Sequence, residues 1–166
     1  MAKFLLGFMG SGKTTVAKYL KGRVVDMDAL IEEKIGMTIS DFFATKGEAA
    51  FRAIESETLE ELLKLEGDTV ISTGGGVVLS EKNRELLRLN RRNNVLLTTS
   101  FEVVYRRIQK DSQAQRPLFQ TKSKEEFQDL FQRRMALYQD LADLVIHTDN
   151  RTPEEIARLI DRKSVV

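Results

Sequence analysis

Short apolar runs recur along the chain and are separated by longer stretches with helical periodicity. The runs that fit buried strands are residues 3–7, 23–26, 69–72, 94–98 and 143–147. Between two of these runs, apolar residues from Phe51 onward fall on one helical stripe, and Arg52 lies beside that stripe. Alternating strands and helices predict an α/β fold in which five parallel strands lie between helices on both faces.

Capping residues mark where several helices begin. Thr38 and Ser123 each precede an acidic residue by three positions, and Thr152 stands directly before Pro153. Hydroxyl side chains in these positions accept hydrogen bonds from the free N–H groups of a first helical turn, and proline suits the first helical position. We therefore expect helices to begin after these three residues.

The composition narrows the class of protein. With 166 residues, of which 42% are hydrophobic, the chain fits one compact domain. It has no cysteine, which excludes disulfides and thiolate metal sites, and no apolar run approaches the roughly 18 residues of a membrane span. The net charge of +1 gives no reason to expect nucleic acid as a partner. A strand from residue 3 leaves no room for a signal peptide, so we expect a cytoplasmic protein without membrane partners.

Residues 7–14 read G-F-M-G-S-G-K-T, a complete phosphate-binding loop. The glycines allow backbone N–H groups to close around phosphate oxygens. Lys13 can reach the β- and γ-phosphates, and the Thr14 hydroxyl can bind Mg²⁺. An apolar run precedes the loop and a helical stretch follows it, which is the order that the motif requires. The sequence thus predicts binding of a nucleoside triphosphate with Mg²⁺.

Two carboxylates, Asp26 and Asp28, follow the apolar run at 23–26. In a strand or its extension, residues i and i+2 point the same way, so we expect both to enter one pocket at the C-terminal edge of the sheet. There they could hold Mg²⁺ through water or accept a proton from an attacking hydroxyl. The alternative is a solvated strand end that caps the next helix.

Three further motifs contain candidate ligand-binding residues. Residues 47–52 read G-E-A-A-F-R and end in Arg52, which could clamp a carboxylate, although a lone arginine is more often a surface residue. Gly74, Gly75 and Gly76 end the run at 69–72 and would let a ligand touch the backbone. Arg134 lies in a predicted helix and could meet the ligand, although two adjacent arginines usually form a solvated face.

Residues 110–124 are polar and lack apolar periodicity. In a phosphoryl-transfer enzyme such a stretch suits a mobile lid, here about 109–124, in which Arg116 could stabilise charge on the transferring phosphoryl group. The alternative is an ordinary exposed loop.

Taken in order, these motifs resemble those of the shikimate kinase family along nearly the whole chain. They are the GFMGSGKTT loop, the two aspartates, GExxFR, STGGG at 72–76, RPL at 116–118 and R-x-x-x-Y at 134–138. The resemblance implies a single kinase domain over 1–166 with the three-layer α/β/α P-loop NTPase fold of nucleoside-monophosphate kinases. Its substrate-binding segment would cover about 28–60. It also implies ATP-dependent phosphorylation of the 3-hydroxyl of shikimate in chorismate and aromatic amino-acid biosynthesis, by a protein that we expect to be monomeric.

The resemblance assigns a role to each candidate residue. Catalysis would involve Lys13, Asp28 and Arg116. The residues expected to hold ATP are Gly10, Ser11, Gly12, Lys13, Thr14, Thr15, Arg116 and Arg151. Mg²⁺ would be bound by Thr14 and, through water, by Asp26. Shikimate would contact Asp28, Arg52, Gly74, Gly75, Gly76 and Arg134.

Three other functions remain as alternatives. A related small-molecule kinase, such as a gluconate kinase, would share the phosphate loop and the architecture. A nucleotide-binding switch like a small GTPase would need an Asn-Lys-x-Asp signature, which the sequence lacks. A catalytically inactive relative is disfavoured because the charged residues of all the motifs are present.

Overall fold

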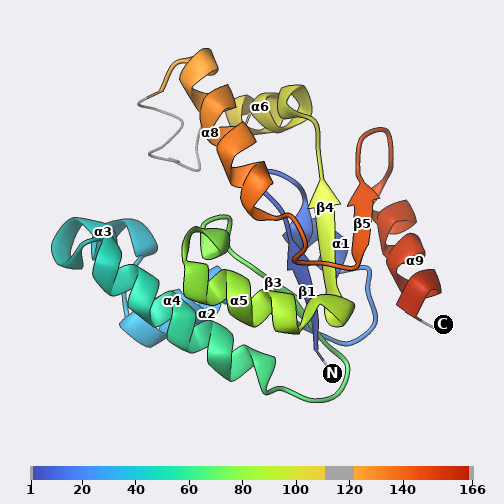
Figure 1. The fold of residues 1–166 in the computed structure, drawn as a ribbon, viewed down its shortest axis with the longest axis horizontal. Coiled ribbons are helices and arrows are strands. Elements are labelled where there is room, and N and C mark those ends of the chain that lie inside the picture. The colour runs from blue at the N-terminus through green and yellow to red at the C-terminus, as the bar shows by residue number, and fades with distance from the viewer. Residues whose placement is uncertain (1, 111–121, 165–166) are drawn as a thin grey trace.

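The computed structural model describes residues 2–110 and 122–164. Five parallel strands form one sheet in the order β2-β3-β1-β4-β5. Their bounds are Lys3–Leu6 (β1), Arg23–Asp26 (β2), Thr69–Ser72 (β3), Asn94–Thr98 (β4) and Leu144–His147 (β5). The strand predictions are confirmed to within one residue at each end. Because all strands run the same way, their carboxyl ends meet at one edge, where doubly wound sheets bind ligands (Figure 1).

Helices cover both faces of the sheet. The larger group comprises α2 (Met27–Ile35), α3 (Ile39–Lys46), α4 (Glu48–Leu63) and α5 (Glu81–Leu89), and the opposite face carries α1 (Lys13–Ala17) and α9 (Pro153–Ser164). Side chains alternate along β1, so Phe4 and Leu6 join the core under α4 and α5, while Leu5 joins the core under α1 and α9. This three-layer arrangement is the predicted fold class.

A third apolar cluster lies above the carboxyl edge of the sheet. It joins α6 (Phe101–Lys110) and α8 (Lys124–Leu137) to the phosphate loop through Phe8 (Figure 1). The Phe8 ring packs edge-on against Phe127 and Phe131 of α8, with ring centroids 5.9 and 5.1 Å apart. Helix α8 is therefore anchored on the loop as well as on its neighbouring helix.

The predicted helix starts are confirmed by their hydrogen bonds. The Thr38 hydroxyl accepts from the Asp41 N–H, and the Thr152 hydroxyl accepts from the Glu155 N–H. Ser123 forms a complete capping box at the start of α8. Arg116 and positions 111–121 of the predicted lid lie outside the described residues. Within the described part of the chain, no helix is long and apolar enough to cross a bilayer.

Candidate functional site

The phosphate loop joins β1 to α1, as its motif requires. Gly10 and Gly12 have φ angles of 79° and 92°, which side chains rarely adopt, so these two positions need glycine for their backbone shape. The loop folds back on itself through a hydrogen bond from the Ser11 N–H to the Phe8 carbonyl, 3.1 Å long. The N–H groups of such a loop form a concave site for phosphate.

Two side chains of the loop form contacts at its centre. The Lys13 ammonium is nearly buried and donates hydrogen bonds to the Gly7 carbonyl and, at 3.1 Å, to the Phe8 carbonyl. The Thr14 hydroxyl lies 3.2 Å from the hydroxyl of Ser72, the last residue of β3. These contacts hold both groups at the carboxyl edge of the sheet.

The two aspartates reach one cavity, but the reason we gave for this from the sequence is wrong. Asp26 ends β2 and caps α2 by accepting from the Ala29 N–H at 3.2 Å, whereas Asp28 already lies in the first turn of α2. A turn of helix, not strand alternation, therefore directs Asp28 to the site. The capping alternative is also correct for Asp26, which does both things: it caps α2 and lines the cavity.

The pKa of Asp28 is shifted by acidic and by basic side chains near it. Burial raises the pKa of its carboxyl above the ordinary value, and the negative charge of Asp26 acts in the same direction. The positive charges of Lys13 and Arg52 oppose that rise in pKa. The pKa of Asp28 therefore responds to charges from both the phosphate loop and α4.

The three glycines at 74–76 are needed for close approach and not for backbone shape, because none has a left-handed φ angle. A Cβ added at Gly74 would lie 2.5 Å from the Asp28 carboxylate, and one at Gly76 would lie 2.6 Å from the Arg52 guanidinium. At Gly75 the nearest atom would be the Met9 backbone nitrogen at 3.3 Å. The turn therefore packs directly against two of the predicted site residues.

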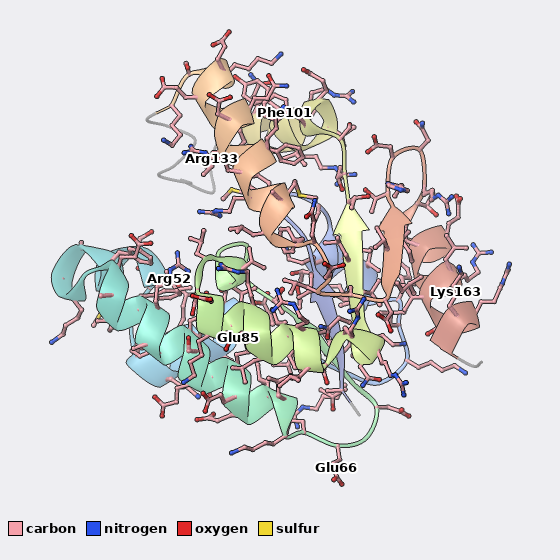
Figure 2. All side chains as sticks on the ribbon, viewed as in Figure 1. Arg52, Glu66, Glu85, Phe101, Arg133 and Lys163 are labelled. Atoms are coloured by element: carbon pink, nitrogen blue, oxygen red, sulfur yellow. The ribbon has the colours of Figure 1, made fainter. Side chains whose placement is uncertain are left out.

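Two arginines reach the glycine turn from different helices. Arg52 of α4 donates to the Gly76 carbonyl at 3.2 Å, and Arg134 of α8 donates to the Gly75 carbonyl at 3.3 Å. Figure 2 shows Arg52 near the beginning of α4, below helix α8, which carries Arg133 next to Arg134. Arg134 is only 7% exposed, its Nε has no hydrogen-bond partner among the described residues, and burial lowers its pKa. A buried guanidinium with a free donor is suited to an anionic ligand.

Glu55 is a site residue that the sequence analysis missed. It is 1% exposed, and its carboxylate accepts from Arg52 at 3.0 Å. Burial raises the pKa of Glu55, and the charge of Arg52 opposes this rise. The spacing of three residues on one helix was a readable signal, because residues i and i+3 lie side by side. Arg52 is thus paired on its own helix with Glu55 and, through its Nε at 3.5 Å, with Glu48.

Arg107 of α6 was also missed. Its guanidinium donates to the Gly10 carbonyl at 2.8 Å and lines the cavity together with the predicted residue Arg151. The contact spans 97 positions in the sequence, and the pair Arg106-Arg107 looks like any charged helix face. No signal in the sequence could have distinguished this arginine from its neighbour.

The cavity measures about 500 Å³. Its lining includes most of the predicted nucleotide and metal residues together with Asp28 and Gly75, namely Gly10, Ser11, Gly12, Lys13, Thr14, Thr15, Asp26, Asp28, Gly75 and Arg151. Gly74, Gly76, Arg52 and Arg134 are not part of this lining. Gly74 lies against Asp28 and Arg134 donates to the Gly75 carbonyl, whereas Arg52 contacts Gly76, the next residue of the turn. The arrangement has a polyphosphate end and an adjoining cationic end, with Asp28 between them.

Comparison with known proteins finds the same family by sequence and by structure. A family model described as shikimate kinase matches residues 9–163. A shikimate kinase from Streptococcus thermophilus is 66% identical over 160 residues, which are 96% of this chain and 98% of that protein. The structure of shikimate kinase from Acinetobacter baumannii in complex with shikimate overlays with a TM-score of 0.86 at 32% identity, covering 99% of this chain and 92% of that one. The shikimate kinase of Aquifex aeolicus overlays with a TM-score of 0.81 at 30% identity, covering 99% and 96% of the two chains.

Proposed function

This chain belongs to the shikimate kinase family, and from that premise we propose how its residues divide the work of the reaction. The enzyme transfers the γ-phosphoryl group of ATP to the 3-hydroxyl of shikimate, a step of aromatic amino-acid biosynthesis. The match over nearly the whole chain favours this activity over that of a gluconate kinase or a nucleotide-binding switch. What remains to be assigned is the role of each residue.

At the polyphosphate end, we assign the loop residues Gly10 to Thr15 to the phosphates of ATP. The left-handed glycines let successive N–H groups face an anion, and the Lys13 ammonium can turn from its backbone carbonyls to the β- and γ-phosphates. Arg107 and Arg151 add positive charge along the cavity wall. Arg116 keeps the role of a lid arginine as a prediction from the family resemblance.

We assign Mg²⁺ to the Thr14 hydroxyl and, through water, to Asp26. Both offer oxygen ligands, which Mg²⁺ prefers, and both line the cavity. Among residues 2–110 and 122–164, no three His, Cys, Asp or Glu side chains are placed so that they could hold a metal ion together, and Mg²⁺ is commonly held by one or two protein groups together with phosphates and water. When bound, the ion neutralises charge that develops on the phosphates.

At the acceptor end, we assign Arg52 and Arg134 to the shikimate carboxylate. The two guanidinium groups converge on neighbouring carbonyls of the glycine turn, and Arg134 has an unused buried donor. The absence of side chains at 74–76 leaves room for the ring to lie against the backbone.

Asp28 carries the proposal, because its carboxylate lines the cavity together with the phosphate loop and lies against Gly74, in the glycine turn that both arginines contact. A hydroxyl bound between these two ends would lie next to its carboxylate. There Asp28 would orient the 3-hydroxyl and accept its proton as the oxygen attacks the γ-phosphorus. Its raised pKa makes the carboxylate a better proton acceptor than an exposed aspartate.

A coupled assay for ADP release tests these roles. With ATP and Mg²⁺, ADP should form with shikimate but not with gluconate, and a chelator should stop the reaction.

The same assay tests the two arginines. Arg52→Ala and Arg134→Ala should raise the KM for shikimate and leave the KM for ATP unchanged. Arg133→Ala is the matched control, since Arg133 is exposed and its Nε donates to the Asp129 carbonyl of its own helix. An increase in the KM for ATP in either site variant would reassign that arginine. Monomeric state and cytoplasmic location stay predictions.

A further inference from the structure

The loop between β5 and α9, residues 148–152, forms part of the cavity wall. Thr148 and Arg151 both line the cavity. The loop contains a tight turn in which the Arg151 N–H donates to the Thr148 carbonyl at 3.1 Å and Asn150 has a left-handed φ angle of 63°. In the proposed function this wall faces ATP, because Arg107 and the phosphate loop line the same cavity.

This loop is hydrogen-bonded to the connection between β4 and α6. The Thr148 N–H donates to the Thr98 carbonyl at 2.8 Å, and the hydroxyls of Thr148 and Thr99 share a buried hydrogen bond. One residue further along, the Asp149 carboxylate accepts from the Ser100 N–H at 3.1 Å. The loop and the start of α6 therefore lie side by side (Figure 1).

Asp149 completes the N-terminal cap of α6 from another segment of the chain. The Ser100 hydroxyl caps this helix by accepting from the Val103 N–H at 3.4 Å. In a complete capping box the residue at the Val103 position is Glu or Gln, and its side chain accepts from the N–H of the capping residue. Helix α8 has such a box, with Glu126. Valine has no acceptor in its side chain, and at α6 Asp149 accepts this bond from 49 positions away.

Helix α6 connects this cap to the phosphate loop. Near the other end of the helix, Arg107 donates to the Gly10 carbonyl at 2.8 Å. Val104 and Ile108 pack on the same glycine, since a Cβ added at Gly10 would lie 3.6 Å from each side chain. The helix thus contacts one wall of the cavity through Arg107 and the opposite segment through the carboxylate of Asp149.

We propose that Asp149 is a positioning residue that holds the β5–α9 loop against α6 and so keeps two walls of the nucleotide cavity at a fixed spacing. This inference rests on the proposed binding of ATP in the cavity. Asp149 is not among the described residues that line the cavity, and we assign it no contact with ATP. Without its bond, the exposed tip of the loop at Asn150 and Arg151 would have to be ordered when ATP binds, which lowers affinity.

The affinity for nucleotide tests the proposal. Binding of a non-hydrolysable ATP analogue with Mg²⁺ is measured by calorimetry for the wild type and for Asp149→Ala. The variant should bind about tenfold more weakly, because two side chains lose their ordering before binding. The KM for ATP should rise too, while kcat at saturating ATP and the KM for shikimate stay unchanged. The melting temperature should fall by about 2 to 4 °C, since α6 loses part of its cap.

A second substitution separates the position of the loop from the stability of the helix. Val103→Glu gives α6 an acceptor of its own, as Glu126 does in α8. In this background the effect of Asp149→Ala on the melting temperature should shrink, because the Ser100 N–H keeps a partner. Its effect on analogue affinity should remain about tenfold, because the loop is still detached from α6.

Glu126→Ala is the matched control, since it removes the same kind of bond, from the Ser123 N–H, at the cap of α8. It should lower the melting temperature by a similar amount and leave analogue affinity unchanged. The proposal would be overturned if Asp149→Ala bound the analogue like the wild type, if its effect on affinity disappeared in the Val103→Glu background, or if Glu126→Ala weakened binding equally. Failure of the proposed function would appear differently, as a wild type that forms no ADP with shikimate.

Discussion

Alanine substitution at each of the three consecutive glycines should separate effects on the chemical step from effects on shikimate binding. In Gly74→Ala the new Cβ would lie 2.5 Å from the Asp28 carboxylate, and in Gly76→Ala it would lie 2.6 Å from the Arg52 guanidinium. Ordinary contact begins at 3.4 Å, so the side chain that meets the methyl must retreat by somewhat less than 1 Å in both variants. None of the three positions needs a left-handed φ angle, so alanine adds no backbone strain.

These displacements act on different groups. A catalytic carboxylate moved by about 1 Å can lower turnover by about a hundredfold, so Gly74→Ala should mainly reduce kcat. Loss of one charge-assisted bond to the shikimate carboxylate weakens binding by about 1.5 to 3 kcal/mol, so Gly76→Ala should raise the KM for shikimate by roughly ten- to a hundredfold. In Gly75→Ala the nearest atoms all belong to Met9, with its backbone nitrogen at 3.3 Å, so the methyl displaces neither Asp28 nor Arg52 and this comparison variant should change both constants least.

The assay is the coupled measurement of ADP release, with shikimate and ATP varied separately. Circular dichroism melting should show that all three variants are folded at the assay temperature. The reasoning would be refuted if Gly74→Ala and Gly76→Ala changed kcat and the KM for shikimate in the same proportion. It would also be refuted if the KM for ATP rose in Gly76→Ala as much as that for shikimate.

Substitution of two charged site residues and of one helix cap gives four further predictions. Lys13→Met should lower turnover by orders of magnitude while the melting curve stays cooperative, and near-normal turnover would exclude the loop assignment. Asp28→Asn should lower kcat and remove an acid limb from the profile of kcat/KM against pH; that limb should lie above the pH of an ordinary aspartate, because the wild-type pKa is raised. The same raised pKa makes the Asp28 charge unfavourable for folding at neutral pH, so Asp28→Asn should melt higher than the wild type at pH 7. That advantage should shrink as the pH falls through the raised pKa and be gone below the ordinary pKa of aspartate; a lower melting temperature at pH 7 would contradict this. Ser123→Ala removes the capping box of α8 and should lower the free energy of unfolding by about 1 kcal/mol, which urea titration would detect, without altering the KM for ATP.

The sequence predicted best what depends on neighbouring residues. The five strands are short apolar runs with clear ends, and the phosphate loop is a local backbone shape that its own glycines determine. The helix caps at Thr38, Ser123 and Thr152 likewise need only the three residues that follow them.

Contacts between distant segments were beyond the reach of this reasoning. Asp28 was placed in the correct cavity for the wrong reason, because the sequence does not show that α2 begins at Met27 and not later. The buried Glu55 and the bond from Arg107 to Gly10 depend on how helices pack. Even the three glycines were explained only in general terms, as an open backbone. Their individual partners became clear from the packing of α2 and α4.

The central claim is that one cleft places the phosphates of ATP and the 3-hydroxyl of shikimate on either side of Asp28. A crystal structure of the enzyme with shikimate, Mg²⁺ and a non-hydrolysable ATP analogue tests this directly. Our account predicts the shikimate carboxylate between Arg52 and Arg134, and the 3-hydroxyl within hydrogen-bond distance of Asp28 and facing the γ-phosphate. A complex in which the carboxylate contacts neither arginine, or in which a different hydroxyl faces the phosphate, would contradict it.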